Sequence, residues 1–178
     1  MRFTVFTAIL LMFPMLANAE TPVFSMGPVF EKFGQVADVE TDFEIPTGTQ
    51  FRVSFDVAKG ANEGEHNRTL VSAARFVNMH ARASAPLDDI DVAIVVHGKA
   101  VLDVTNPLKY EDEIGGDNVN RTLVAALIEQ GVRIIVCGQS AAHQNVTKTD
   151  LLPGVEMALS AMTAHAVLQR DGYTLNPF

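Results

Sequence analysis

The residue of this sequence best suited to chemistry is its single cysteine, Cys137. Cys137 follows the apolar run 132–136 and precedes Gly138, a pattern that predicts the end of a buried strand and the start of a helix. Backbone N–H groups at a helix start favour a thiolate, and a neighbouring glycine lets another molecule approach the sulfur. Nucleophilic sulfur chemistry is one interpretation of this junction. A small, buried packing residue is the other.

His97 is the histidine that we expect beside this sulfur. It follows the β-branched run 90–96, and an imidazole there accepts the proton of a thiol or pairs with the thiolate. The alternative interpretation is a histidine whose nitrogens bond to loop backbone. The candidate site combines two reacting residues, Cys137 and His97, with four surrounding positions: Gly98, Gly138, Gln139 and Ser140. Among these, the amides of Gly138 and Gln139 are the expected anion donors.

Other kinds of site have less support. A metal site would need Cys137 and His97 with His66 or His143, and no two of these residues have a close ligand spacing, so we predict no metal. Ser140 lacks the G-x-S-x-G context of a serine hydrolase, and no phosphate-binding glycine motif is present, so we predict no cofactor. The remaining histidines fall in helical patterns and are expected to be structural: His80 and His165.

Composition narrows the class of protein. The chain has 178 residues, which suits one domain, and 13 basic against 21 acidic residues give a formal charge of −8. A chain so acidic is not expected to bind nucleic acid. One cysteine excludes a disulfide framework within the chain and any metal site built on several thiolates.

The first residues read as a secretory signal. Arg2 gives a positive start, residues 3–16 are almost continuously apolar, and Ala17-Asn18-Ala19 has the pattern of a cleavage site. The apolar run is shorter than the roughly 20 residues that span a bilayer, and no later segment is long enough, so we expect no stable membrane insertion after cleavage. The expected location is the bacterial periplasm, where a lone thiol is unusual.

The elements that must position Cys137 and His97 alternate along the chain. After a signal peptide (1–19) and an extended arm (20–50), one domain is expected over 51–178. Strands are predicted at 51–57, 90–96, 132–136, 155–159 and 172–175. Helices are predicted at 66–83, 118–130, 140–145 and 160–170, with a variable stretch at 99–117.

This alternation predicts an α/β fold, a three-layer α/β/α sandwich with a mainly parallel sheet. In such sheets, ligands bind outside the carboxyl ends of the strands. The loops 59–66, 97–99 and 137–140 should therefore lie on one edge of the sheet, which brings Cys137 and His97 together.

Several segments also resemble a known family. The runs 51–57, 95–98 and 131–140, with the tail 150–155 and 168–173, are similar to the DsrE/DsrF-like proteins, specifically their secreted branch. The resemblance covers residues 50–176. It implies a flavodoxin-like sandwich that forms homo-oligomers. In the cytoplasmic relatives it implies a cysteine that carries sulfur as a persulfide, at the position of Cys137.

Two functions follow as hypotheses. In the first, the protein is a periplasmic sulfur carrier, rather than an enzyme that releases a product. Cys137 accepts sulfane sulfur, His97 holds or deprotonates it, and the partners are a donor or acceptor protein or a small sulfur compound. In the second, it is a non-catalytic, oligomeric module that binds a small ligand or partner. A metal-binding protein is the third and weakest option.

Overall fold

The computed structural model describes residues 23–177. The predicted signal peptide, residues 1–19, lies outside this range. The strands are β1 (Phe24–Ser25), β2 (Val36–Ala37), β3 (Phe51–Val57), β4 (Ile90–Val96), β5 (Arg133–Cys137), β6 (Glu156–Ala158) and β7 (Thr174–Asn176). The α-helices are α1 (Arg68–Arg82), α2 (Pro107–Glu113), α3 (Asn120–Glu129), α4 (Gly138–His143) and α5 (Ala161–Arg170). Short 3₁₀ helices lie at Leu87–Asp89, Gly98–Val104 and Lys148–Asp150.

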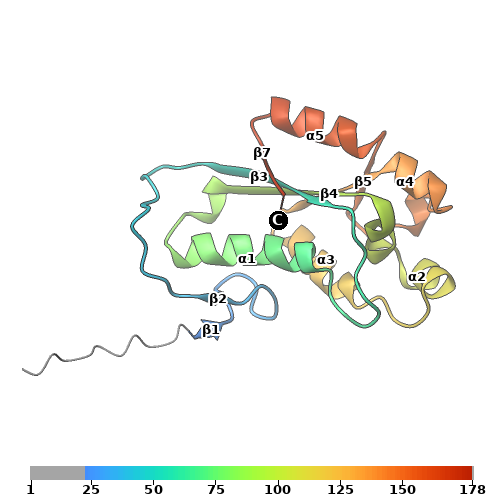
Figure 1. The fold of residues 1–178 in the computed structure, drawn as a ribbon, viewed down its shortest axis with the longest axis horizontal. Helices are drawn as coiled ribbons and strands as arrows, with labels where there is room; N and C mark the ends of the chain where they lie inside the picture. The colour runs from blue at the N-terminus through green and yellow to red at the C-terminus, as the bar shows by residue number, and fades with distance from the viewer. Residues whose placement is uncertain (1–22, 178) are drawn as a thin grey trace, which may run out of the picture.

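Strands β3 to β7 form one parallel sheet in the order β6-β5-β4-β3-β7. Helices α1 and α3 cover one face of the sheet and α5 covers the other, as Figure 1 shows. This arrangement confirms the predicted three-layer α/β fold. Because the strands are parallel, the ends of β3, β4 and β5 meet at one edge, as expected.

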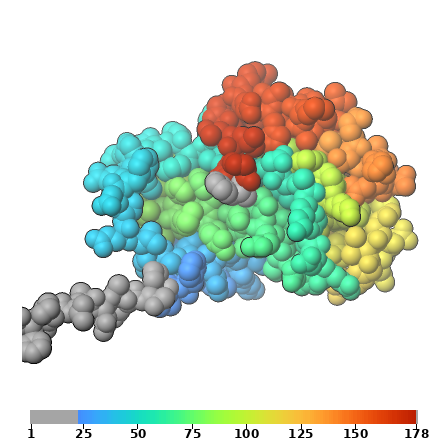
Figure 2. All heavy atoms as spheres, in the orientation of Figure 1, coloured from blue at the N-terminus to red at the C-terminus, as the bar shows by residue number. Residues whose placement is uncertain are grey.

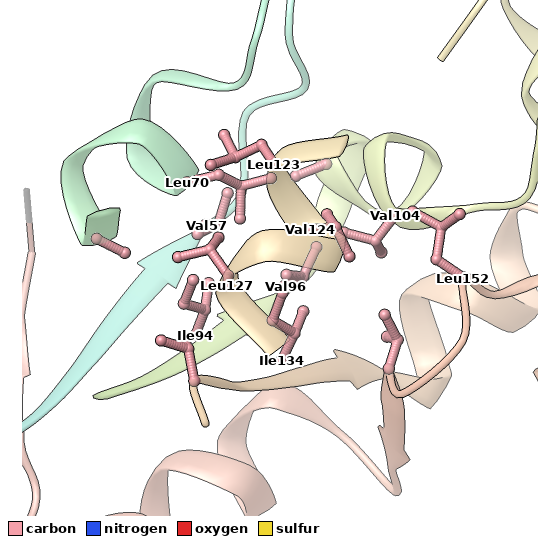
Figure 3. Close-up of a cluster of buried hydrophobic side chains, with 14 of the residues drawn as sticks. Val57, Leu70, Ile94, Val96, Val104, Leu123, Val124, Leu127, Ile134 and Leu152 are labelled. Atoms are coloured by element: carbon pink, nitrogen blue, oxygen red, sulfur yellow. The ribbon is translucent and has the colours of Figure 1, made fainter. Parts of the chain in front are cut away.

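The face under α1 and α3 holds the larger core. Leu70 of α1 and Leu123 and Leu127 of α3 are fully buried, and Figure 3 shows them above Ile94 and Ile134 of the central strands. Removing each such side chain from water stabilises the fold by about 1.5–3 kcal/mol. β4 is apolar on both faces because both are covered.

In the described part of the chain, α5 is the helix that covers the opposite face. Its cluster is small and consists of Ala93, Val95, Ile135, Ala164 and Leu168. The side chain of Ser160 caps α5 by accepting the N–H of Thr163 at 3.0 Å, which confirms the predicted start of this helix.

The stretch 99–117 is more ordered than predicted. It contains the 3₁₀ helix Gly98–Val104 and the helix α2, which Asn106 caps through its side chain. Pro107 is the first residue of α2, a position where proline favours a helix, whereas the whole stretch 99–117 was predicted to be variable.

The first part of the predicted arm packs on the domain. Phe30 and Val36 are buried, and Asn78 of α1 accepts the N–H groups of Val29 and Phe30. Residues 38–50 are mostly exposed, and in the space-filling view their blue and cyan spheres form one end of the molecule, apart from the red of α5 (Figure 2).

Candidate functional site

Cys137 ends β5 and is the N-cap residue of α4. Ile135, two residues earlier on the strand, packs in the cluster under α5, so Cys137 lies on that same face of the sheet. The residue is 6% exposed. Its sulfur is therefore largely withdrawn from water at the edge where ligands bind in sheets of this type.

Within the described residues, four hydrogen-bonding groups near this sulfur act to lower its pKa. They are the Ser140 hydroxyl and the backbone N–H groups of Ser140, Ala161 and Gln139. Burial raises the pKa of Cys137, but these donors outweigh burial and lower the pKa below its ordinary value. Gln139 and Ser140 lie in the first turn of α4 and Ala161 begins α5, so two helix starts face one thiolate.

Ser140 is oriented by the loop that follows β4. The N–H of Gly98 donates to the Ser140 Oγ at 3.1 Å, which leaves the hydroxyl hydrogen for the sulfur. Gln144 donates to the carbonyl oxygens of Gly98 and Ser140. Gly98 has φ +52°, and a Cβ there would lie 2.8 Å from the carbonyl oxygen of Ala58, so only glycine fits.

Gly138 has a different role from the predicted one. A Cβ at Gly138 would lie 2.7 Å from the carbonyl oxygen of Ala158, so β6 occupies the space that was expected to admit another molecule. Of the two expected amide donors, Gln139 is among the groups that lower the pKa of Cys137, together with the backbone N–H groups of Ser140 and Ala161.

His97 bonds to a carboxylate. Its Nε2 lies 3.0 Å from Oδ2 of Asp56, and Nε2 of His165 lies 2.8 Å from Oδ1 of the same side chain. Burial raises the pKa of Asp56, but the hydrogen bonds and charges of the two histidines lower it overall. Among the described residues, no hydrogen bond joins His97 to Cys137, so the use of His97 on the thiol stays a prediction.

The strand register nevertheless places His97 level with Cys137. Val96 pairs with Val136 in the parallel ladder between β4 and β5. The next residue after each of these two is His97 in one segment and Cys137 in the other. The N–H of His97 donates to the carbonyl of Val57 at 2.8 Å, which keeps the residue in line with the sheet.

The other histidines lie elsewhere. The ring of His66 packs edge-on against Phe33, and Nδ1 of His80 lies 2.7 Å from the carbonyl oxygen of Phe76. His143, at the end of α4, is exposed. Within residues 23–177, no three His, Cys, Asp or Glu side chains gather so as to hold a metal ion.

A second polar cluster lies at the same edge, on the α1 and α3 side. Oδ2 of the buried Asp103 accepts the N–H of Ala61 at 2.9 Å and the side-chain amide of Asn67 at 2.6 Å. Asn67 in turn donates its N–H to the buried Asn120. Burial raises the pKa of Asp103 more than its two donors lower it. This cluster fastens the loop between β3 and α1.

Sequence reasoning missed Asp56, the bond of His165, and the Ala161 amide. Asp56 occupies a polar position of an alternating strand, a pattern that does not indicate a partner. Its signal is the fold itself, because a sheet covered on both faces places such a carboxylate partly sheltered beneath a helix, where it needs donors. His165 and Ala161 reach the site only through the packing of α5.

Comparisons with known proteins give a family and a fold. The profile of the DsrE/DsrF-like family matches residues 53–177. Comparison with curated protein sequences finds no match. Two solved structures are similar: MTH1491 of Methanobacterium thermoautotrophicum, described as of unknown function, and the ychN protein of E. coli. The first has a TM-score of 0.54 and 20% identity over 72% of this chain and 99% of its own. The second has a TM-score of 0.50 and 17% identity over 72% and 100%.

These two similarities establish the fold alone, since both identities are low. In the described part of the chain, no helix has the length and apolar character needed to cross a bilayer.

Proposed function

The chain belongs to the DsrE/DsrF-like family, and we propose that Cys137 accepts sulfane sulfur as a persulfide and passes it to another thiol. Family membership suggests a sulfur-relay type of function. The single observation that carries the finer proposal is the set of donors around the sulfur, which lowers the pKa of Cys137 and so favours the nucleophilic thiolate.

The transfer balances without an oxidant. The Cys137 thiolate attacks the outer sulfur of a donor persulfide, a new S–S bond forms, and the donor's own S–S bond breaks to release its thiolate. In the second step an acceptor thiolate attacks the outer sulfur now held on Cys137. Cys137 leaves as a thiolate, and the same donors that favour its ionisation favour its departure.

The protein acts in this proposal as a carrier in the bacterial periplasm. The signal-like residues 1–19 support that location, and the donor and acceptor are small sulfur compounds or the thiols of partner proteins. The family resemblance supports a homo-oligomer. Chromatographic mass measurement of the mature chain, and detection in a periplasmic fraction, test these two points.

Sulfur loading is tested with glutathione persulfide. The mature protein is incubated with the donor, desalted and weighed intact, and the modified peptide is located. We expect the mass of one extra sulfur atom on Cys137, removed by dithiothreitol, and no addition to Cys137→Ser. A folded wild-type protein whose thiol stays unmodified would end the proposal.

One observation favours a second candidate, a non-catalytic binding module. A hollow of about 260 Å³ lies between β6 and α5, and its lining includes Met157, Leu159 and Val167. Leu159 is 72% exposed. A binding module would keep its cellular role in Cys137→Ser and lose it in Leu159→Ser, whereas a sulfur carrier would show the reverse.

A further inference from the structure

The cluster Asp56–His97–His165 lies on the same face of the sheet as Cys137 and, among the described residues, makes no hydrogen bond to its sulfur. Asp56 lies between two imidazoles, each of which presents its Nε2 to a different carboxylate oxygen, at 3.0 and 2.8 Å. The Asp56 side chain is 36% exposed and the His165 side chain 15%. The cluster is thus half-sheltered beneath α5.

The carboxylate fixes which ring nitrogens carry hydrogen. An ionised carboxylate only accepts, so both Nε2 atoms are donors. The lowered pKa of Asp56 supports the ionised form. In each neutral imidazole the remaining nitrogen, Nδ1, is then the proton acceptor. Nδ1 of His165 is buried and has no partner among the described residues. His97 is the more exposed ring, with 31% of its side chain accessible.

The position of His97 connects this cluster to the sulfur. His97 is level with Cys137 in the parallel register, and the next residue, Gly98, donates to the Ser140 hydroxyl that itself bonds to the sulfur. The thiolate is already stabilised by four donors from the described residues. His97 is therefore available for a different proton, the one exchanged with the donor or acceptor of the sulfur.

We propose that His97 is the catalytic acid and base for the sulfur partner of Cys137, with Asp56 and His165 as its positioning residues. This inference rests on the proposed sulfur transfer. During loading, imidazolium His97 gives its Nδ1 proton to the thiolate that leaves the donor. During unloading, neutral His97 takes the proton of the acceptor thiol, whose sulfur then attacks the outer sulfur on Cys137. His97 loses a proton during loading and regains one during unloading, so protons balance over the cycle.

Asp56 and His165 act through His97. Asp56 holds the ring with Nδ1 turned away from the carboxylate, as orienting carboxylates do for catalytic histidines. His165 binds the other carboxylate oxygen and so limits the rotation of Asp56. The unpartnered Nδ1 of His165 costs free energy. The bond from its Nε2 to Asp56 is the role that we assign to this histidine.

Two probes separate this role from a general effect on the thiol. When Cys137 attacks dithiodipyridine, the leaving thiolate is weakly basic and departs without a proton. When Cys137 attacks glutathione persulfide, the leaving glutathione thiolate is more basic, and a proton assists its departure. We expect His97→Gln to react with dithiodipyridine as fast as wild type, and to load from glutathione persulfide about a hundredfold more slowly. Asp56→Asn should show the same selective loss, to a smaller extent.

Matched variants complete the test. Asp91→Asn removes an exposed carboxylate from β4 at the other end of the sheet and should leave both rates unchanged. His165→Gln keeps a side-chain N–H for Asp56 and should load faster than His165→Leu. If Asp56→Asn does not fold, the His97 variant still decides the question.

The outcomes are distinguishable. Wild-type protein that reacts with dithiodipyridine but takes no sulfur from the persulfide overturns the proposed function itself. Wild-type loading that is matched by His97→Gln overturns the role of His97 and leaves the carrier function intact. Equal slowing of His97→Gln with both probes also overturns the inference, because it would place the effect on Cys137.

Discussion

Cys137 and Asp103 are two acidic groups buried at the same edge of one sheet. The pKa of Asp103 is raised above its ordinary value, whereas the pKa of Cys137 is lowered. Asp103 has two donors from the described residues, and burial outweighs them, so its pKa rises and its charged form is disfavoured. Cys137 has four such donors, which outweigh burial, so its pKa falls and its charged form is favoured. Burial at this edge therefore does not by itself make a reactive group.

The origin of the donors separates the two regions. At Asp103 they come from a loop amide and a neutral asparagine side chain, and they hold a loop in place. At Cys137 they come from the starts of two helices and a hydroxyl that is itself oriented by Gly98. The first arrangement stabilises the fold, while the second prepares a nucleophile.

The largest expected effect is on stability, at Asp103. Asp103→Ala leaves the Ala61 N–H and the Asn67 amide without their acceptor, and we expect a loss of roughly 2–4 kcal/mol in the free energy of unfolding. Asp103→Asn keeps an acceptor oxygen and should lose less. Denaturant unfolding of both variants gives the comparison.

Wild type and Asp103→Asn together test the raised pKa of Asp103. A carboxyl whose pKa is raised by folding favours the folded state below its unfolded pKa and loses that contribution as pH rises. Wild type should therefore lose stability relative to Asp103→Asn between acidic and neutral pH. A relative gain over that range would show that the Asp103 carboxylate is stabilised, like the thiolate.

The next effect is expected at Gly138. Gly138→Ala places a Cβ 2.7 Å from the Ala158 carbonyl oxygen, so β6 or the start of α4 must shift, at a cost of about 1–3 kcal/mol. Gly60→Ala, in the loop near Asp103, meets its nearest atom at 3.2 Å and should cost less. Equal thermal midpoints for the two variants would contradict the tight packing at Cys137.

A smaller effect is expected at Ser140. Ser140→Ala removes one donor to the thiolate, which raises the pKa of Cys137 and should slow alkylation by iodoacetamide at neutral pH about tenfold. Ser140→Thr keeps the hydroxyl and serves as the control. If Ser140→Ala reacts as fast as wild type, the backbone donors alone suffice.

The smallest effect is a pH dependence of stability. A thiol whose pKa is lowered by folding adds stability at pH values above its unfolded pKa, and this addition is lost as pH falls through the folded pKa. The stability of wild type relative to Cys137→Ser should therefore increase with pH up to the ordinary pKa of a thiol. Chemical unfolding at several pH values measures the trend, and a flat difference would mean an unshifted thiol.

Local patterns made much of the fold predictable. The alternating run at β3 and the β-branched run at β4 define strands whose bounds, Phe51–Val57 and Ile90–Val96, match the prediction. Ser160 marked the start of α5 by its side-chain chemistry. Helix α2 was missed because Pro107 breaks a helix in its interior but favours its first turn.

The candidate site was predictable only in part, for a related reason. Cys137, Gln139 and Ser140 are close in sequence, so a strand followed by a helix start is enough to group them. Ala161 and His165 reach the same edge through the packing of α5, a contact that no local pattern encodes. Asp56 was hidden by the strand alternation that identified β3.

The most direct test of the account compares Cys137 with an ordinary thiol in the same protein. Cys137→Ser combined with Ala125→Cys moves the only cysteine to an exposed position in the middle of α3, away from any helix start. Sulfur uptake from glutathione persulfide is timed for both proteins at neutral pH by intact mass. We predict that wild-type Cys137, although buried, loads faster than the exposed thiol by about tenfold or more. Loading of Cys137 that is equal to or slower than that of the exposed thiol would contradict it.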